Sequence, residues 1–277
     1  MTNEELNENG VEPPRRVPVL PSLITLGNIL CGFSSICLAA RGVDLGSRTT
    51  ALSYAAWAIL LAMVFDALDG RVARLTRQTS DFGGHLDSLS DVISFGVAPA
   101  FLVWQVIKES GTFPGWIERV MWLICVLYVV CAALRLARFD ASNRHEEEAH
   151  RSFVGLPSPP AAGTVASLVL VYGWLDETPQ LMGIVGSYVL PIVVFFVGLL
   201  MISKVRYPHM MNELFKNRRS FRFFMFLIFV LFLVGASKFV LLPVIFVVYV
   251  LSGLVGLAVD KILDRIDVAQ SRRAALK

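Results

Sequence analysis

The stretch FDALDGRVARLTRQTSDFGGHLDSLSDVISFGVAP, residues 65–99, decides the fold, because it puts four aspartates at the ends of two apolar segments. Asp66 and Asp69 are three residues apart, so they lie on one face of a helix. Asp87 and Asp91, four residues apart, share a face in the same way. At 1.5 Å of rise per residue, the members of each pair are separated by about 4.5 Å and about 6 Å along the axis. We therefore predict two helices that present one acidic face each.

The segments on either side of this stretch are long and apolar. Of the 277 residues, 55% are hydrophobic and 17% are charged, whereas soluble domains carry about 25% charged residues. The mean hydropathy is +0.63. About eight segments approach the ~20 residues that a helix needs to cross a membrane, so we predict an all-α, polytopic membrane helix bundle. The predicted spans are residues 19–40, 50–70, 86–107, 117–137, 158–175, 183–203, 221–237 and 239–258.

The distribution of Lys and Arg predicts the orientation of these spans. With a cytosolic N-terminus, most of the 25 Lys and Arg residues fall on the cytosolic side, as in membrane proteins generally. We expect both termini in the cytosol and the protein in the cytoplasmic (inner) membrane. The basic residues left on the opposite side are Arg41, Arg48, Lys108, Arg119 and Lys238.

The same features predict the domain organisation and exclude several classes of protein. A transmembrane domain over residues 19–258 would lie between a polar cytosolic tail, 1–18, and a second cytosolic tail, 259–277. The acidic start of the chain lacks the basic region of a cleaved signal peptide. Four dispersed cysteines and a net charge of +3 exclude a secreted disulfide scaffold and a nucleic-acid binder. The longer polar loops are cytosolic, so we expect the chemistry at the cytosolic helix ends.

The turn around residues 80–84 can bring the two acidic pairs together. One Asp at the bilayer centre costs about 2.5–3.5 kcal/mol, and repulsion among four adds to this cost. A divalent cation offsets both the cost of burial and the repulsion. A site made only of carboxylate oxygens suits Mg²⁺ or Mn²⁺. In the alternative reading, the aspartates lie in a solvated turn and pair with Arg71, Arg74 and Arg77.

The stretch resembles the CDP-alcohol phosphotransferase family, since it fits the signature D-x2-D-G-x2-A-R-x8-G-x3-D-x3-D at every fixed position. This resemblance implies a two-metal site made by all four aspartates, with Asp91 also acting as the general base. It implies a nucleotide cradled by Gly70, Ala73 and Gly83, with Arg74 near its phosphates. The expected reaction is displacement at the phosphorus that carries diacylglycerol, with CMP leaving.

Three other segments resemble the phosphatidylserine synthase branch of this family. The resemblance implies transfer from CDP-diacylglycerol to L-serine by a homodimer in membrane lipid, and polar contacts of Thr25 and Asn28 with the nucleotide. Where the branch often has Pro-Asn, this chain has Pro21-Ser22, so no role is carried over to that position. The segments are LPSLITLGNILCGF at 20–33, LRLARF at 134–139 and FVGLPSPPAA at 153–162.

Serine differs from other acceptor alcohols because it carries both a carboxylate and an ammonium group. Arg135 and Arg138 are three residues apart at a predicted cytosolic helix end, where two guanidinium groups could grip the carboxylate. Ordinary positive-inside anchoring explains either arginine equally well. Arg151 is a further candidate, and we expect Ser158 near the acceptor pocket.

Three alternative functions remain open from the sequence. A sister transferase would use glycerol 3-phosphate, inositol phosphate or choline as the acceptor. An intramembrane prenyltransferase also uses aspartates and metal, but its motifs lie on two separated helix pairs, whereas this chain has one cluster. An ion or proton transporter would usually carry its acids near the bilayer midplane, and here they gather at one end.

Overall fold

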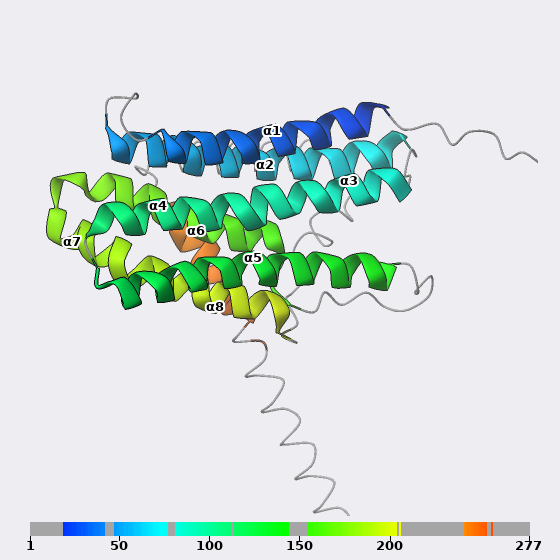
Figure 1. Cartoon of the computed structure of the whole chain (residues 1–277). Coiled ribbons are helices and arrows are strands. Elements are labelled where there is room, and N and C mark those ends of the chain that lie inside the picture. The colour runs from blue at the N-terminus through cyan, green and yellow to red at the C-terminus, as the bar shows by residue number, and fades with distance from the viewer. Residues whose placement is uncertain are drawn as a thin grey trace, which may run out of the picture.

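Helices make up all the regular structure in the part of the chain that the computed structural model describes, residues 19–41, 47–76, 81–111, 113–143, 155–203, 205, 241–253 and 256. Figure 1 shows most of them running side by side as an elongated bundle. The helices are α1 (Val19–Ala40), α2 (Arg48–Thr76), α3 (Asp81–Asp91), α4 (Ala98–Ser110), α5 (Gly115–Asn143), α6 (Ser158–Trp174), α7 (Pro179–Ile184) and α8 (Leu190–Ile202). Two π-helical segments, η1 (Val92–Val97) and η3 (Val185–Val189), and a short 3₁₀ turn, η2 (Leu175–Glu177), complete them.

Five helical stretches within the described residues are long and apolar enough to cross a membrane, as expected of a membrane helix bundle. They coincide with the first four predicted spans and the sixth. Helix α6 occupies the fifth with 17 residues, and an apolar helix, Leu241–Gly253, lies within the eighth. The seventh predicted span lies outside the described residues. The five stretches are Ser22–Ala40, Arg48–Val72, Phe82–Ser110, Gly115–Ala141 and Pro179–Ile202.

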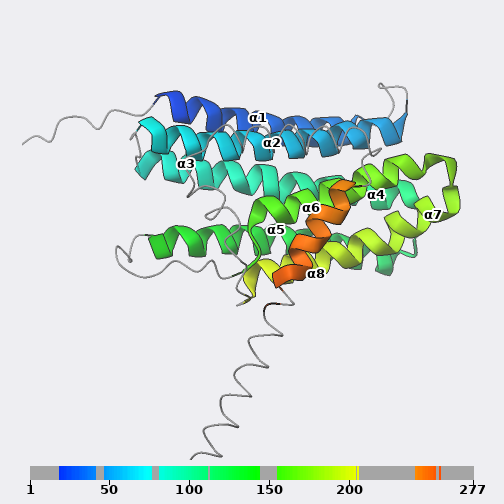
Figure 2. The ribbon, with the colours of Figure 1, turned by 180° about the vertical axis from the view of Figure 1, so that it is seen from behind.

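The helices pack partly on chain neighbours and partly on helices that are distant in the sequence. Helix α1 packs along α2, and both contact the continuous rod made by α3, η1 and α4 (Figure 1). Helix α6 packs on α2, and α8 on α5. Seen from behind, Leu241–Gly253 crosses α6 and α8 (Figure 2), and at Gly163 of α6 a Cβ would overlap the ring of Phe246. Small residues at such crossings let helix backbones approach closely.

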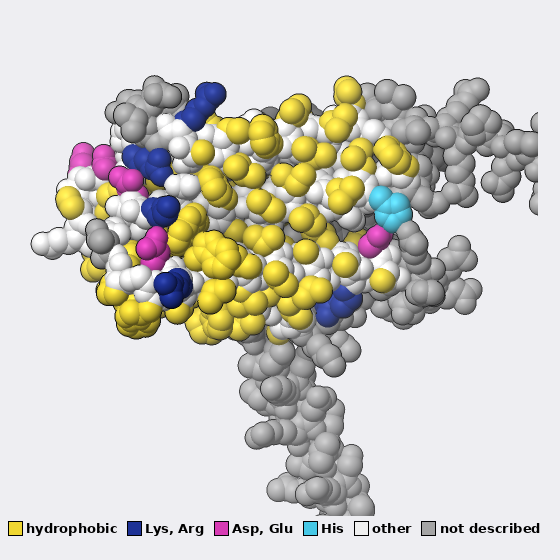
Figure 3. All heavy atoms as spheres, in the orientation of Figure 1, with side chains coloured by type: hydrophobic (Ala, Val, Ile, Leu, Met, Phe, Trp, Pro, Cys, Tyr) yellow, Lys and Arg dark blue, Asp and Glu magenta, His cyan; other side chains and the backbone are white. Residues whose placement is uncertain are grey.

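The outer surface of the bundle is apolar, and polar side chains turn inward. Hydrophobic side chains cover the middle of the face in Figure 3, whereas charged side chains gather toward its two ends. On α1, Leu23 and Leu30 are exposed, while Thr25, Asn28 and Ser35 are buried. This arrangement is the reverse of that of a soluble helix, and it suits a helix whose outer face contacts lipid. This pattern supports an integral membrane protein.

The rod of α3, η1 and α4 changes its helical geometry directly after Asp91. Pro99 has no N–H group, so the carbonyl of Phe95 lacks the donor that a regular helix would supply. The hydroxyl of Tyr128 on α5 donates a hydrogen bond to this carbonyl at 3.1 Å. Tyr128 is fully buried, and the bond fixes α5 against the widened part of the rod.

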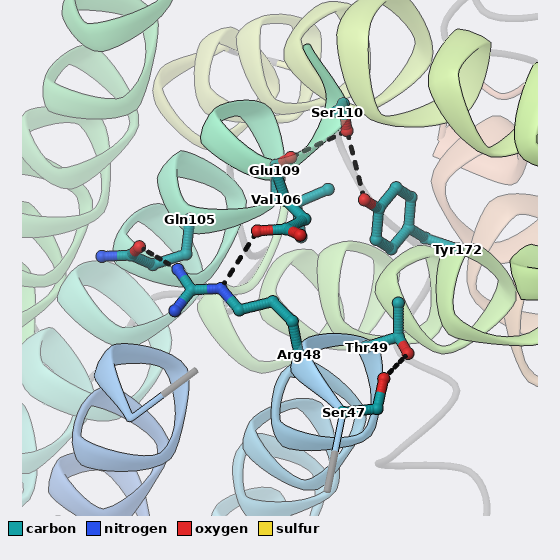
Figure 4. Close-up of polar contacts among 8 residues, drawn as sticks. All are labelled: Ser47, Arg48, Thr49, Gln105, Val106, Glu109, Ser110 and Tyr172. Carbon is teal, nitrogen blue, oxygen red and sulfur yellow. Dashed lines mark hydrogen bonds and ion pairs between the residues drawn. The ribbon is translucent and has the colours of Figure 1, made fainter. Parts of the chain in front are cut away.

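The bundle end that lies far from the aspartates is closed by polar contacts between α2 and α4 (Figure 4). The Nη2 of Arg48 donates a hydrogen bond to Oε1 of Gln105 at 2.7 Å, and its Nε lies 3.3 Å from Oε2 of Glu109. Nearby, Ser110 donates to the hydroxyl of Tyr172 at 3.4 Å. The contacts of Arg48 join the first residue of α2 to α4, and the contact of Ser110 joins the end of α4 to α6.

Replacing Tyr128 by Phe should destabilise the protein by about 1–3 kcal/mol, because the buried carbonyl of Phe95 would lose its donor. Thermal unfolding of the purified protein in detergent measures this loss. Tyr54→Phe is the matched control, since Tyr54 is half exposed on α2. Equal shifts in the two variants would contradict a special role for the bond to Phe95.

Candidate active site

Three of the four aspartates meet at one end of the bundle. Asp66 and Asp69 lie in the second half of α2, and Asp87 lies in α3. One carboxylate oxygen from each falls within 4.8 Å of the other two. Helix α2 continues seven residues past Asp69, and α3 begins at Asp81, so residues 81–84 of the predicted turn are helical instead.

Asp91 lies one helical turn beyond Asp87 and is bonded to α1. It is 7% exposed, and its Oδ1 accepts a hydrogen bond from Nδ2 of Asn28 at 3.3 Å. It also interacts electrostatically with Asp66 and Asp87. Asp91 therefore lies beside the cluster, but it is not one of the three aspartates whose oxygens lie within 4.8 Å of one another.

Two carboxylate oxygens of the cluster are buried without a hydrogen-bond donor among the described residues, namely Oδ2 of Asp69 and Oδ1 of Asp87. A buried anionic oxygen is costly unless a cation or a donor compensates it. Oxygen ligands alone, gathered this closely, match the coordination chemistry of Mg²⁺ and Mn²⁺. The residues present therefore fit a divalent cation.

Helix α1 supplies polar groups along the face that contacts α3 and η1. The side chain of Thr25 hydrogen-bonds to Asp69, and its carbonyl accepts a bond from Oγ of Ser90 at 3.3 Å. The carbonyl of Asn28 accepts a bond from Oγ of Ser94 at 2.9 Å. These bonds hold α1 against the helix that carries Asp91.

A buried arginine faces the acids from the opposite wall. Arg135 on α5 is 9% exposed, and its Nη1 donates a hydrogen bond to Oγ of the fully buried Ser158 at 2.9 Å. Arg135 also interacts electrostatically with Asp91 and Asp66. The site therefore combines a cluster of carboxylates with a positive charge that is shielded from solvent, where electrostatic attraction is strong.

The loop before α6 fixes the position of Ser158. Gly155 has a φ of +97°, which favours glycine, and its N–H donates to the carbonyl of Val205 at 2.8 Å. The N–H of Leu156 donates to the carbonyl of Leu200 at 3.0 Å. Both bonds hold the loop against the end of α8 and the residues just after it, and this fixes the backbone that leads into Ser158.

The structure brings together only some of the other residues that the sequence singles out. Gly70 and Gly83 are half-buried on the two helices that bear the aspartates, and Ala73 lies in α2. Arg138 is exposed on α5, three residues beyond Arg135. Arg151 and the side chains of Ala73 and Arg74 lie outside the described residues.

Two contacts in the site were missed by the sequence analysis. One is the bond between Asn28 and Asp91, and the other is the approach of Arg135 to the acids. A signal for the first exists, because Thr25, Asn28 and Ser35 recur at helical spacing within an apolar segment. No comparable pattern pairs Arg135 with the acids, since they lie on different helices.

Comparisons with known proteins show which family the sequence matches. The family described as CDP-alcohol phosphatidyltransferase matches residues 18–201. The chain is 33% identical to the CDP-diacylglycerol-serine O-phosphatidyltransferase of Methanocaldococcus jannaschii, over 73% of this chain and 79% of that protein. It is 34% identical to the protein of that name from Helicobacter pylori, over 69% and 72%. It is 36% identical to the archaetidylserine synthase of Methanothermobacter thermautotrophicus, over 68% and 69%.

Proposed function

Because this chain belongs to the CDP-alcohol phosphatidyltransferase family, we propose that it transfers the phosphatidyl group of CDP-diacylglycerol to the hydroxyl of L-serine and releases CMP. The observation that carries this proposal is the cluster of Asp66, Asp69 and Asp87, in which one buried oxygen of Asp69 and one of Asp87 lack a donor among the described residues. Serine as the acceptor is supported by the names of the three relatives, which all contain it.

All four aspartates would hold divalent cations in a two-metal site, with either Mg²⁺ or Mn²⁺. Asp66, Asp69 and Asp87 would supply the closest ligands, because their oxygens already converge. When bound, a pair of such ions stabilises the attacking and departing oxygens of an in-line displacement. The protein contributes the fixed arrangement of carboxylates and a site from which lipid and helices exclude water.

Asp91 would act as the general base. It would take the proton from the serine hydroxyl as that oxygen forms its bond to the phosphorus of the phosphatidyl group. The bond from this phosphorus to the CMP oxygen breaks, and CMP leaves with the electron pair. One oxygen of Asp91 accepts the bond from Asn28, which leaves the other for the substrate proton.

The nucleotide would bind along the surface of α2 and α3 beside the acids. Gly70, Ala73 and Gly83 would cradle it, because residues with little or no side chain allow a ligand to approach the helix backbone. Arg74 would contact the phosphates, since a guanidinium can donate two hydrogen bonds to phosphate oxygens. Thr25 would add a polar contact from α1.

Serine would bind between α5 and α6. Arg135 uses one donor for Ser158, and its guanidinium has further donors that can hold the serine carboxylate. Arg138 and Arg151 would add positive charge at the entrance. The attraction between Arg135 and Asp91 would bring the carboxylate anchor and the base to the same pocket.

We further propose the full topology that the basic residues predict. Eight spans would leave both termini in the cytosol, with the transmembrane domain over 19–258 and tails at 1–18 and 259–277. The acids would then open to the cytosolic side of the cytoplasmic membrane, where serine arrives and CMP leaves. The donor's acyl chains would stay in the bilayer, and the protein would form a homodimer.

Purified protein should release CMP from CDP-diacylglycerol with L-serine, and only in the presence of Mg²⁺ or Mn²⁺. A panel with serine, glycerol 3-phosphate, inositol phosphate and choline measures the acceptor directly. Release with glycerol 3-phosphate but not with serine would refute the proposed acceptor. Ion flux without CMP formation would instead indicate a transporter.

Mn²⁺ should bind to the purified protein without any substrate, and the loss of the free-ion EPR signal measures its affinity. Replacing Asp66, Asp69 or Asp87 by Asn should weaken binding by about tenfold or more, because each change removes a charged ligand. Asp140→Asn is the control, since Asp140 lies on α5 and pairs with His85 at 3.2 Å. Unchanged Mn²⁺ affinity in all three variants would contradict the proposed metal site.

Arg135→Lys should raise the apparent KM for serine about tenfold, because lysine keeps the charge but loses the planar set of donors. The KM for CDP-diacylglycerol should not change. Steady-state kinetics with each substrate varied in turn measures both constants. Arg119→Lys, about 24 Å away on the same helix, is the control. An equal loss with every acceptor would assign Arg135 to the scaffold.

A further inference from the structure

Asn28 makes a side-chain hydrogen bond to Asp91 from a different helix. Its Nδ2 lies 3.3 Å from Oδ1 of Asp91, and the amide is fully buried. An ionised carboxylate can only accept a hydrogen bond, so the amide must present its nitrogen to Asp91. This bond joins α1 to the end of α3.

We propose that Asn28 is a positioning residue for Asp91, holding one carboxylate oxygen so that the other faces the acceptor hydroxyl. The proposal rests on the proposed function, in which Asp91 takes the hydroxyl proton. It gives Asn28 a role on the acceptor side of the reaction, whereas the sequence predicts a contact with the nucleotide. The two roles differ in which kinetic constant they affect.

The amide is poorly suited to a purely structural role. Its Oδ1 is buried and has no hydrogen-bond partner among the described residues. A buried acceptor left in this way costs about 1–3 kcal/mol, and an apolar side chain of similar size avoids the cost. The donor that Asn28 offers to Asp91 is the compensating gain, and a leucine cannot provide it.

The backbone around Asn28 is held as firmly as its side chain. Ser94, three residues after Asp91, donates a hydrogen bond from its Oγ to the carbonyl of Asn28 at 2.9 Å. This approach needs Gly32, because a Cβ there would overlap Ser94. The backbone bond holds α1 against η1, whereas the side-chain bond alone contacts the Asp91 carboxylate and sets its direction.

The position of Asp91 makes such a restraint necessary. Asp66 and Asp87 repel its carboxylate, and Arg135 attracts it from α5. A carboxylate under these opposing forces can rotate toward the arginine or toward bound cations. A fixed neutral donor keeps one rotamer without adding charge, so the free oxygen stays where a base must be.

The test compares Asn28→Leu with Ser94→Ala in purified protein. Asn28→Leu removes the donor to Asp91 at nearly constant size, and it should lower kcat about 10- to 100-fold, as the loss of comparable supporting hydrogen bonds does. The KM for CDP-diacylglycerol should stay at its wild-type value. Ser94→Ala removes the bond to the Asn28 backbone but keeps the amide, so its kcat should stay near wild type.

Each other outcome overturns the proposal. A raised KM for CDP-diacylglycerol with unchanged kcat makes Asn28 a nucleotide contact. Equal losses of kcat in the two variants, in parallel with their thermal unfolding midpoints, make it a structural residue. If Asn28→Leu does not fold, Asn28→Ala is judged by the same constants, because it removes the donor without adding bulk.

The proposed function can fail separately from the role of Asn28. If wild-type protein fails to release CMP with every alcohol in the panel, the proposed function itself is refuted. Wild-type protein that prefers another alcohol changes the acceptor, and the Asn28 variants are then measured with that alcohol. Wild-type activity with serine together with full kcat in Asn28→Leu overturns only the role of Asn28.

Discussion

Repulsion among closely spaced carboxylates, some buried and some half-buried, is the constraint on which the site depends. Asp66, Asp69 and Asp87 approach within 4.8 Å at the end of an apolar bundle, where water does not screen them fully. Such an arrangement persists only if other groups compensate the charge. Arg135 provides one positive charge, hydrogen bonds from α1 provide further stabilisation, and the donor-free oxygens leave a place for divalent cations.

The bilayer explains why these compensating groups lie inside the bundle. Lipid cannot hydrogen-bond to a side chain, so a polar group on a spanning helix is stable only against another helix. Helix α1 therefore turns Thr25 and Asn28 inward and leaves Leu23 and Leu30 at the surface. An apolar solvent thus collects the reactive groups in the interior, where they can act on a lipid-linked substrate.

The sequence predicted most of the helices and the acidic faces, because both depend on local spacing. Residues three and four apart share a helix face wherever the helix lies, so the approach of Asp66 to Asp69 follows from their spacing in the sequence alone. The meeting of Arg135 with Ser158 and Asp91 could not be predicted in this way, since it depends on how α5, α6 and α3 pack. The exposure of Arg138 and burial of Arg135 have the same origin, because neighbouring helices cover only one of them.

The π-helical segment η1 determines how the faces of α3 and α4 are rotated relative to each other. A regular α-helix rotates by about 100° for each residue, whereas a wider turn accommodates one residue more in nearly the same rotation. The acid-bearing face of α3 and the packing face of α4 are therefore offset by one position in the sequence but aligned in space. Deleting one residue between 92 and 97 would therefore convert η1 to a regular α-helical turn and keep the carboxylates facing the same way, whereas deleting one residue from the regular part of α3 that follows Asp87 would rotate them by roughly a quarter turn relative to α5.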